Sequence, residues 1–170
     1  MTVETTLVKV DADLRAGRIP VARQRLRGLV GSYPADLTVR RRLAEVYRLY
    51  GEPAEAGRWA YLDADRDPAE TAAFEARHPD PLERMLALAW RGSEGSARTE
   101  TARARLAGLR EVASAHAGRS IHWDHVRDHA QNTDQDDSTG LFACAGLALV
   151  VLVLLGFTGL GAVTFVRWWL

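Results

Sequence analysis

Three histidines in the second half of the chain have a spacing that could bind a metal ion. His122, His125 and His129 lie three and four positions apart, so a helix would bring them to one face, with Asp124 or Asp128 as an oxygen ligand. Such a site also needs groups that orient the ligands and exclude water, and this segment is short and polar. We therefore predict no metal and no cofactor here.

A second group of residues that could bind a ligand consists of four arginines, at positions 40, 41, 42 and 48. A guanidinium can bind a carboxylate or a phosphate through two parallel hydrogen bonds, so Arg41 and Arg48 on one helix face could bind an acidic peptide. The alternative is a solvated face. Glu45 and Glu52 each follow one of these arginines by four residues and would neutralise it.

No constellation typical of an enzyme is found. The glycines form neither GxGxxG nor a lysine-containing phosphate loop, and the serines lack a nucleophile elbow. The only cysteine, Cys144, lies in an apolar segment, which excludes an intramolecular disulfide. Lys and Arg total 22, as do Asp and Glu, so the net charge of zero disfavours nucleic acid as a partner. We predict that the protein is not an enzyme.

The segment Leu141–Val166 contains no charged residue and spans 26 positions. As a helix it would measure about 39 Å, against a hydrocarbon core of about 30 Å. Arg167, Trp168 and Trp169 follow directly, as expected at a membrane interface. We predict one transmembrane helix at 141–166 and a short tail at 167–170.

An anchor near the C-terminus is released by the ribosome only when synthesis ends. Since the N-terminus has no apolar signal core, we expect a single-pass protein of the cytoplasmic membrane with its N-terminal domain in the cytoplasm. A stripe of small residues would let two such helices approach, so a homodimer through the span is one alternative and a monomeric anchor in lipid is the other. The stripe consists of Gly140, Cys144, Ala148 and Gly156.

The N-terminal half repeats with a period of 34 residues. Gly17, Ala22 and Pro34 recur as Gly51, Ala56 and Pro68. Glycine suits a tight turn between helices, alanine suits a close helix approach, and proline suits the start of the next unit. The period indicates paired antiparallel helices.

Over residues 3–68 the chain resembles the tetratricopeptide family, as LAEVYRLYGEPAEAGRW shows most clearly. It departs from the family pattern at Lys9, Asp13, Ala60 and Asp63. In that family the first helix of each unit lines a concave groove, and the resemblance implies a partner-binding surface here. Its residues would be Arg41, Glu45, Arg48 and Leu49. The whole chain also resembles a bacterial family that joins such a helical region to variable C-terminal ends, a resemblance that implies no activity.

Helix start signals extend beyond the repeats. Glu52-Pro53, Asp67-Pro68 and Asp80-Pro81 each place proline at the first helical position, with glutamate two residues later. No segment alternates like a strand, so we predict an all-α fold. The expected helices cover residues 3–16, 19–31, 37–50, 53–65, 68–77, 81–91 and 100–117.

The predicted organisation is a tetratricopeptide-like domain at 1–92, a capping helix within 93–118 and a polar juxtamembrane linker at 119–140. Within that linker, an amphipathic helix that rests Ile121, Trp123 and Val126 on lipid headgroups is an alternative. We expect Trp59, Tyr61, Phe74, Met85, Leu86 and Trp90 to fill the core.

The predicted function is a membrane-anchored scaffold or adaptor. It would recruit a protein or acidic peptide to the inner face of a bacterial membrane, with membrane lipid as its other contact. The alternative is a small membrane-acting effector or sensor whose transmembrane helix associates when a partner binds.

Overall fold

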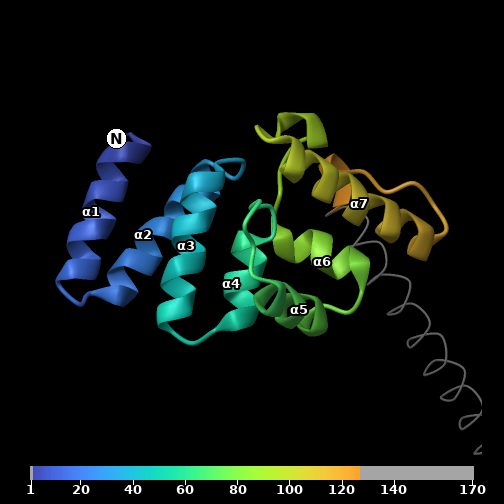
Figure 1. Ribbon diagram of the computed structural model, residues 1–170. Coiled ribbons are helices and arrows are strands. Elements are labelled where there is room, and N and C mark those ends of the chain that lie inside the picture. The colour runs from blue at the N-terminus through green and yellow to red at the C-terminus, as the bar shows by residue number, and fades with distance from the viewer. Residues whose placement is uncertain (1, 127–170) are drawn as a thin grey trace, which may run out of the picture. The chain divides into compact units, whose positions relative to one another are not determined.

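The computed structural model describes residues 2–126, and every regular element in this range is a helix (Figure 1). The all-α fold class is therefore confirmed for this range. The α-helices are α1 Val3–Arg15, α2 Ile19–Ser32, α3 Leu37–Leu49, α4 Pro53–Ala60, α5 Pro68–Arg77, α6 Pro81–Leu88 and α7 Glu100–Ala117. Two 3-10 turns, η1 Glu94–Ser96 and η2 Trp123–His125, complete the order.

The predicted proline start signals are all observed as helix starts, but only two have a side-chain cap. Asp67 Oδ1 accepts hydrogen bonds from two backbone N–H groups of α5 at 2.7 and 3.2 Å, and Asp80 Oδ1 does the same for α6 at 2.6 and 3.0 Å. Glu52 makes no such bond to α4. Aspartate is short enough to reach the first turn, which is why it leads among N-cap residues.

Two helices end earlier than the sequence predicts. Arginines bind backbone carbonyl groups just after the end of α4 and at the end of α6. Helix α4 ends at Ala60 instead of residue 65, and Arg105 of α7 donates to the carbonyl oxygens of Tyr61 and Asp63 beyond it. Helix α6 ends at Leu88 instead of residue 91. The next residue, Ala89, takes a left-handed conformation with φ of 52°.

The helices from α1 to α5 pack each against the next along the chain, as Figure 1 shows for α1 to α4 side by side. The repeat positions have matching environments. Gly17 and Gly51 both turn the chain with positive φ, 71° and 67°, and Ala22 and Ala56 are both 0% exposed. After α5 the pattern changes, because α6 packs against α7 and α4.

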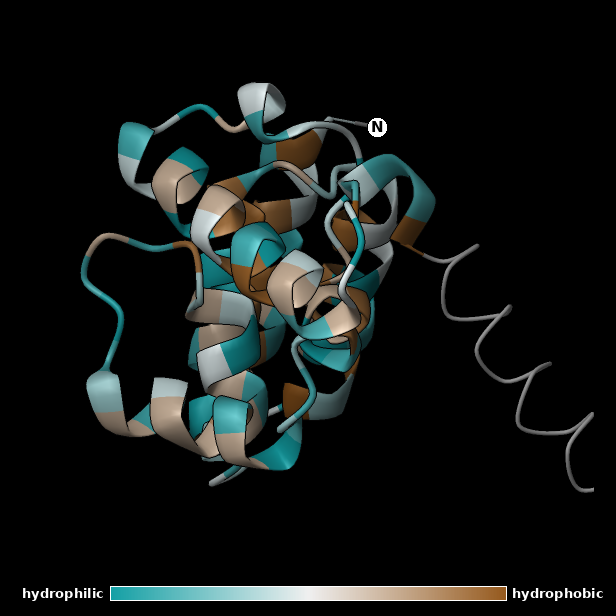
Figure 2. Cartoon of the chain, turned by 90° about the vertical axis from the view of Figure 1, so that its right-hand side faces the viewer, coloured by the Kyte–Doolittle hydropathy of each residue, from teal (hydrophilic) through white to brown (hydrophobic). Residues whose placement is uncertain are grey.

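Two clusters of buried side chains hold residues 2–126 together. The first lies among α1 to α4, and the second joins the end of α4 to α5, α6, α7 and η2. In Figure 2 the hydrophobic segments lie toward the inside of the helix array. The core prediction is confirmed: Trp59, Tyr61, Phe74, Met85 and Trp90 are buried, and Leu86 packs partly buried against the second cluster.

The segment after α7 differs from the predicted polar linker at 119–140. Ile121, Trp123 and Val126 are all buried, and Trp123 Nε1 donates to the Leu106 carbonyl oxygen at 3.3 Å. These three side chains complete the second cluster, so the alternative that rests them on lipid headgroups is wrong. Residues 1–127 form one compact unit, which includes the predicted capping helix.

Within residues 2–126 no helix is long and apolar enough to cross a bilayer. The predicted transmembrane helix at 141–166, the tail at 167–170 and the remainder of the predicted linker lie outside the described residues. The anchor therefore stays a prediction from sequence.

Candidate functional site

The predicted partner-binding residues share one side of α3. The helix begins after Asp36, whose Oδ1 accepts from the N–H groups of Thr38 and Val39 at 2.9 and 3.1 Å. Spacings of three and four residues then align the four predicted positions. Arg41, Arg48 and Leu49 are exposed and Glu45 is partly exposed, so the structure brings together Arg41, Glu45, Arg48 and Leu49 on an accessible surface.

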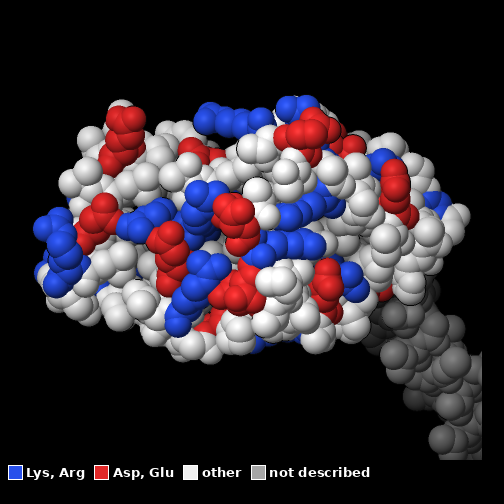
Figure 3. Space-filling model, in the orientation of Figure 1, with Lys and Arg blue, Asp and Glu red and all other residues white. Residues whose placement is uncertain are grey.

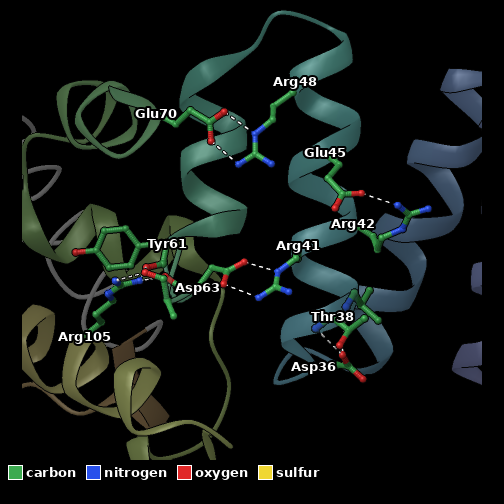
Figure 4. Close-up of polar contacts among 12 residues, drawn as sticks. Asp36, Thr38, Arg41, Arg42, Glu45, Arg48, Tyr61, Asp63, Glu70 and Arg105 are labelled. Atoms are coloured by element: carbon green, nitrogen blue, oxygen red, sulfur yellow. Dashed lines mark hydrogen bonds and ion pairs between the residues drawn. The ribbon is translucent and has the colours of Figure 1, made fainter. Parts of the chain in front are cut away.

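Both arginines of this surface already bind a carboxylate of the same chain (Figure 4). Arg41 contacts both oxygens of Asp63, with Nη2 to Oδ1 at 2.6 Å, and Arg48 contacts both oxygens of Glu70 at 2.6 and 2.7 Å. The bond from Arg41 lowers the pKa of Asp63, and the carboxylates raise the pKa of both guanidiniums. These shifts favour the charged forms of Arg41, Arg48 and Asp63 at neutral pH.

Glu45 pairs within its own helix instead of with Arg41. Its Oε2 accepts from Arg42 Nη1 at 2.6 Å, and Arg42 also binds Asp11 of α1. The face seen in Figure 3 accordingly interleaves positive and negative side chains. A neutralised face was one of the two readings of the sequence, but the partners differ from the predicted Glu45 and Glu52.

Sequence reasoning missed these partners because they come from other parts of the chain: Asp63 lies between α4 and α5, and Glu70 lies in α5. A signal was nevertheless present: the pairs Arg41–Asp63, Arg48–Glu70 and Arg77–Glu55 all span 22 residues. A fixed separation of this kind is expected where helices of similar length stack in order.

The most consequential missed residue is Arg40, which the sequence groups with exposed arginines. It is 1% exposed, and it donates to the carbonyl oxygens of Pro34 at 3.1 Å and Leu88 at 2.6 Å. Its guanidinium carbon lies 5.2 Å from the ring centre of Trp59 and 6.0 Å from that of Trp90. Arg40 therefore joins α3 to the carbonyl end of α6.

Arg40 has no carboxylate partner among the described residues. Its burial and the nearby charge of Arg58 lower its pKa to about 9, so it still carries its charge at neutral pH. Arg58 donates to the Ala87 carbonyl oxygen, next to the carbonyl that Arg40 binds. Cations are favourable at a helix C-terminus, where the last carbonyls lack helical partners. The two arginines thus fix the end of α6.

The histidine hypothesis receives no support from the part of the chain that is described. Within residues 2–126 no three His, Cys, Asp or Glu side chains are close enough to hold a metal ion. His122 precedes η2 and lies 3.1 Å from the Ser120 hydroxyl, while His125 ends η2. His129 and Asp128 lie outside the described residues.

Comparison with known proteins places nearly the whole chain in one family. No curated protein and no solved structure matches it. A family model, described as a family of unknown function (DUF6584), matches residues 1–167. Because the match covers nearly the full length, the chain belongs to the DUF6584 family.

Proposed function

We propose that this protein is a membrane-anchored helical scaffold that recruits a protein partner to the inner face of a bacterial membrane. The observation that carries the proposal is the surface of α3, where Leu49 is 61% exposed beside two arginines that are held by bidentate ion pairs. An apolar anchor within a rigid polar rim is the usual composition of a protein-binding patch.

A tetratricopeptide-like arrangement supports this assignment of the surface. Gly17 and Gly51 make equivalent turns, Ala22 and Ala56 are equally buried, and α3 is the first helix of the second unit. In the family that the sequence resembles, this helix lines the groove that binds partners. Arg41, Glu45, Arg48 and Leu49 are the proposed contact residues.

The ion pairs bear on the kind of partner. A short acidic peptide would have to displace Asp63 from Arg41 and Glu70 from Arg48, and both pairs already satisfy the fork of the guanidinium. A folded protein can instead cover Leu49 and align its own charges with the mixed rim. A protein partner is therefore favoured over an acidic peptide.

The membrane part of the proposal rests on the uncharged segment at 141–166 and the Arg-Trp-Trp that follows it. A chain truncated after Gly140 should move to the soluble fraction, while the full chain should stay in membranes through a carbonate wash. Recovery of the full chain in the soluble fraction would contradict the anchor.

The partner surface is tested by a photo-crosslinking amino acid placed at Leu49 of the full chain in its native cells. Val8 of α1, which is 65% exposed, is the matched control position. We expect a discrete crosslinked adduct from Leu49 and none from Val8. Equal adducts from both positions, or no adduct from Leu49, would contradict the assigned surface.

A charge variant then tests the rim. Arg41→Glu with Arg48→Glu should remove the Leu49 adduct and leave the fold intact, because exposed ion pairs contribute only about 0.2–1 kcal/mol each. Arg15→Glu with Arg98→Glu makes the same change in net charge at two exposed arginines outside the surface. If this control also removes the adduct, net charge and not the α3 surface attracts the partner.

A further inference from the structure

A cavity of about 190 Å³ lies among α2, α3, α4 and the segment that follows α6. Three arginines line it: Arg27 of α2, Arg58 of α4 and Arg91 after α6. Its apolar wall includes Val30 and the ring of Trp59, and no acidic residue is among the described side chains that line it. None of these residues belongs to the proposed partner surface on α3.

The arginines of this cavity are poorly neutralised. Arg27 and Arg91 make no hydrogen bond or ion pair with any described residue, in contrast to Arg41 and Arg48 on the α3 surface. Arg58 has one carboxylate neighbour, Glu55, at 3.3 Å, and Glu55 is shared with Arg77 at the same distance. Two of the three lining guanidiniums, both on exposed residues, therefore form no ion pair within residues 2–126.

The wall of the cavity adds to this excess of positive charge. Arg40 lies against it, because its guanidinium donates to the Pro34 carbonyl and sits over the Trp59 ring, and both residues line the cavity. The lowered pKa of Arg40 has desolvation as its main cause and repulsion by Arg58 as its second. Among residues 2–126 no carboxylate offsets either effect.

Two buried donors at this place also lack acceptors. Trp59 Nε1 and Arg40 Nε are both shielded from solvent, and neither has a hydrogen-bond partner in the described structure. Buried N–H groups without acceptors are rare, and each requires an explanation such as an absent ion. Trp59 is 7% exposed and lines the cavity. Its unpaired N–H group therefore belongs to the same cavity as the two arginines that form no ion pair.

We propose that this cavity binds the phosphate group of a small phosphomonoester. A phosphomonoester carries a charge of about −1.5 to −2 at neutral pH, which matches the two lining guanidiniums that have no carboxylate. A carboxylate ligand would neutralise only one of them. Arginine forks fit phosphate oxygens bidentately, and the apolar wall at Val30 and Trp59 suits the organic part. The small volume suits a small ligand, since sites for drug-sized ligands measure about 300–1,000 Å³.

The phosphate could belong to a free metabolite or to the headgroup of a lipid, and both present the same chemistry to the three arginines. The test therefore uses one probe of each kind. Phenyl phosphate represents a soluble phosphomonoester, and dihexanoyl phosphatidic acid represents a lipid monoester that stays dispersed in water. Benzoate at the same concentration is the monoanionic control for phenyl phosphate.

The experiment is isothermal titration of the full-length chain in a non-ionic detergent at constant ionic strength. We expect at least one of the two phosphomonoesters to bind, and to bind about tenfold or more tightly than benzoate, because a phosphate can accept more charge-assisted hydrogen bonds from the arginines than a carboxylate can. The stronger of the two probes identifies the source of the phosphate. Absence of binding by both, or equal binding of benzoate and phenyl phosphate, would overturn the proposal.

Variants assign the binding to this cavity. Arg27→Gln with Arg91→Gln should weaken phosphomonoester binding by about tenfold or more without lowering the melting temperature, since neither side chain has a partner to lose. Arg15→Gln with Arg98→Gln removes two exposed arginines elsewhere and should leave binding unchanged. If both pairs weaken binding equally, overall charge attracts the anion and the cavity is not the site. This outcome is independent of the crosslinking result at Leu49.

Discussion

The two core clusters of residues 2–126 are built in different ways. The first contains small side chains such as Ala22, Ala44 and Ala56, all 0% exposed, where α1 to α4 pack, together with the rings of Tyr47 and Trp59. The second is filled by large rings, with Tyr61 and Phe74 in edge contact at 5.6 Å and two buried tryptophans. Helices that repeat can pack through small residues at matching positions, whereas helices that do not repeat leave gaps that large side chains fill.

Helices α4 and α5 approach each other closely at Gly57 of α4. A Cβ added there would overlap with the carbonyl group of Glu70 in α5 and would lie 3.0 Å from Thr71 N. We expect Gly57→Ala to destabilise the protein by more than about 3 kcal/mol, beyond ordinary overpacking, because the obstruction is backbone. Thermal or urea unfolding by circular dichroism measures it.

Gly108→Ala in α7 is the matched control, because nothing lies within 4 Å of the added Cβ. There alanine should stabilise the helix by about 0.5–1 kcal/mol. If Gly57→Ala and Gly108→Ala have the same stability, the packing of α4 on α5 does not depend on their close approach at Gly57. That result would contradict the prediction.

The second cluster should respond strongly to loss of a ring. Trp123 is 4% exposed, and Trp123→Ala should cost about 3 kcal/mol, the lower end of the range for such truncations. Hydrogen exchange would show where the loss falls. We expect protection to drop most in α6 and α7 and least in α1 and α2. A uniform drop in all helices would mean that the two clusters unfold together. The control variant is Val112→Ala, at a position that is 53% exposed.

The smallest expected effect concerns a buried carboxylate, Asp13, on α1, whose Val10 belongs to the first cluster. Asp13 accepts from Arg18 at 2.8 and 3.0 Å and from Arg25 at 2.8 Å, and these bonds lower its pKa below the ordinary value. Its stabilising contribution is therefore complete above the unfolded pKa of about 3.9 and is lost as the pH falls through the lower folded value.

Asp13→Asn should remove that part of the acid sensitivity. Melting temperatures measured from pH 6 to pH 2 should fall less steeply in the variant than in the natural chain, although the variant starts lower at pH 6. Asp65→Asn, at an exposed aspartate, should leave the slope unchanged. Parallel slopes for Asp13→Asn and the natural chain would show that this carboxylate does not contribute to acid unfolding.

Much of the fold could be predicted because its signals are local. Proline after aspartate starts α5 and α6, glycine turns the chain at 17 and 51, and helical spacing defines the rest. The predicted ends of α4 and α6 were wrong because arginines from distant helices bind the carbonyls there, and such contacts leave no local trace in the sequence.

The candidate site was predictable only in part. The positions on α3 follow from helical period, but the partners of its arginines do not, because Asp63 and Glu70 follow 22 residues later. Asp13 and Asp63 stand where the tetratricopeptide family, which the sequence only resembles, usually has apolar residues, and both prove to be ion-pair carboxylates. Departures from a repeat pattern can therefore mark where a chain replaces apolar packing with ion pairs.

The contact from Arg40 to the Leu88 carbonyl spans 48 residues, which gives it a consequence for synthesis. At about 5–20 residues per second, the ribosome delivers Leu88 roughly 2–10 s after Arg40. During that interval Arg40 of α3 has the Pro34 carbonyl as an acceptor, but its second acceptor, the Leu88 carbonyl, does not yet exist. Burying the Arg40 guanidinium at that stage would desolvate its charge without this acceptor. The surface of α3 around Arg40 must therefore stay hydrated until α6 has been synthesised. The N-terminal repeats can form early, but they can close only after α6 has been made.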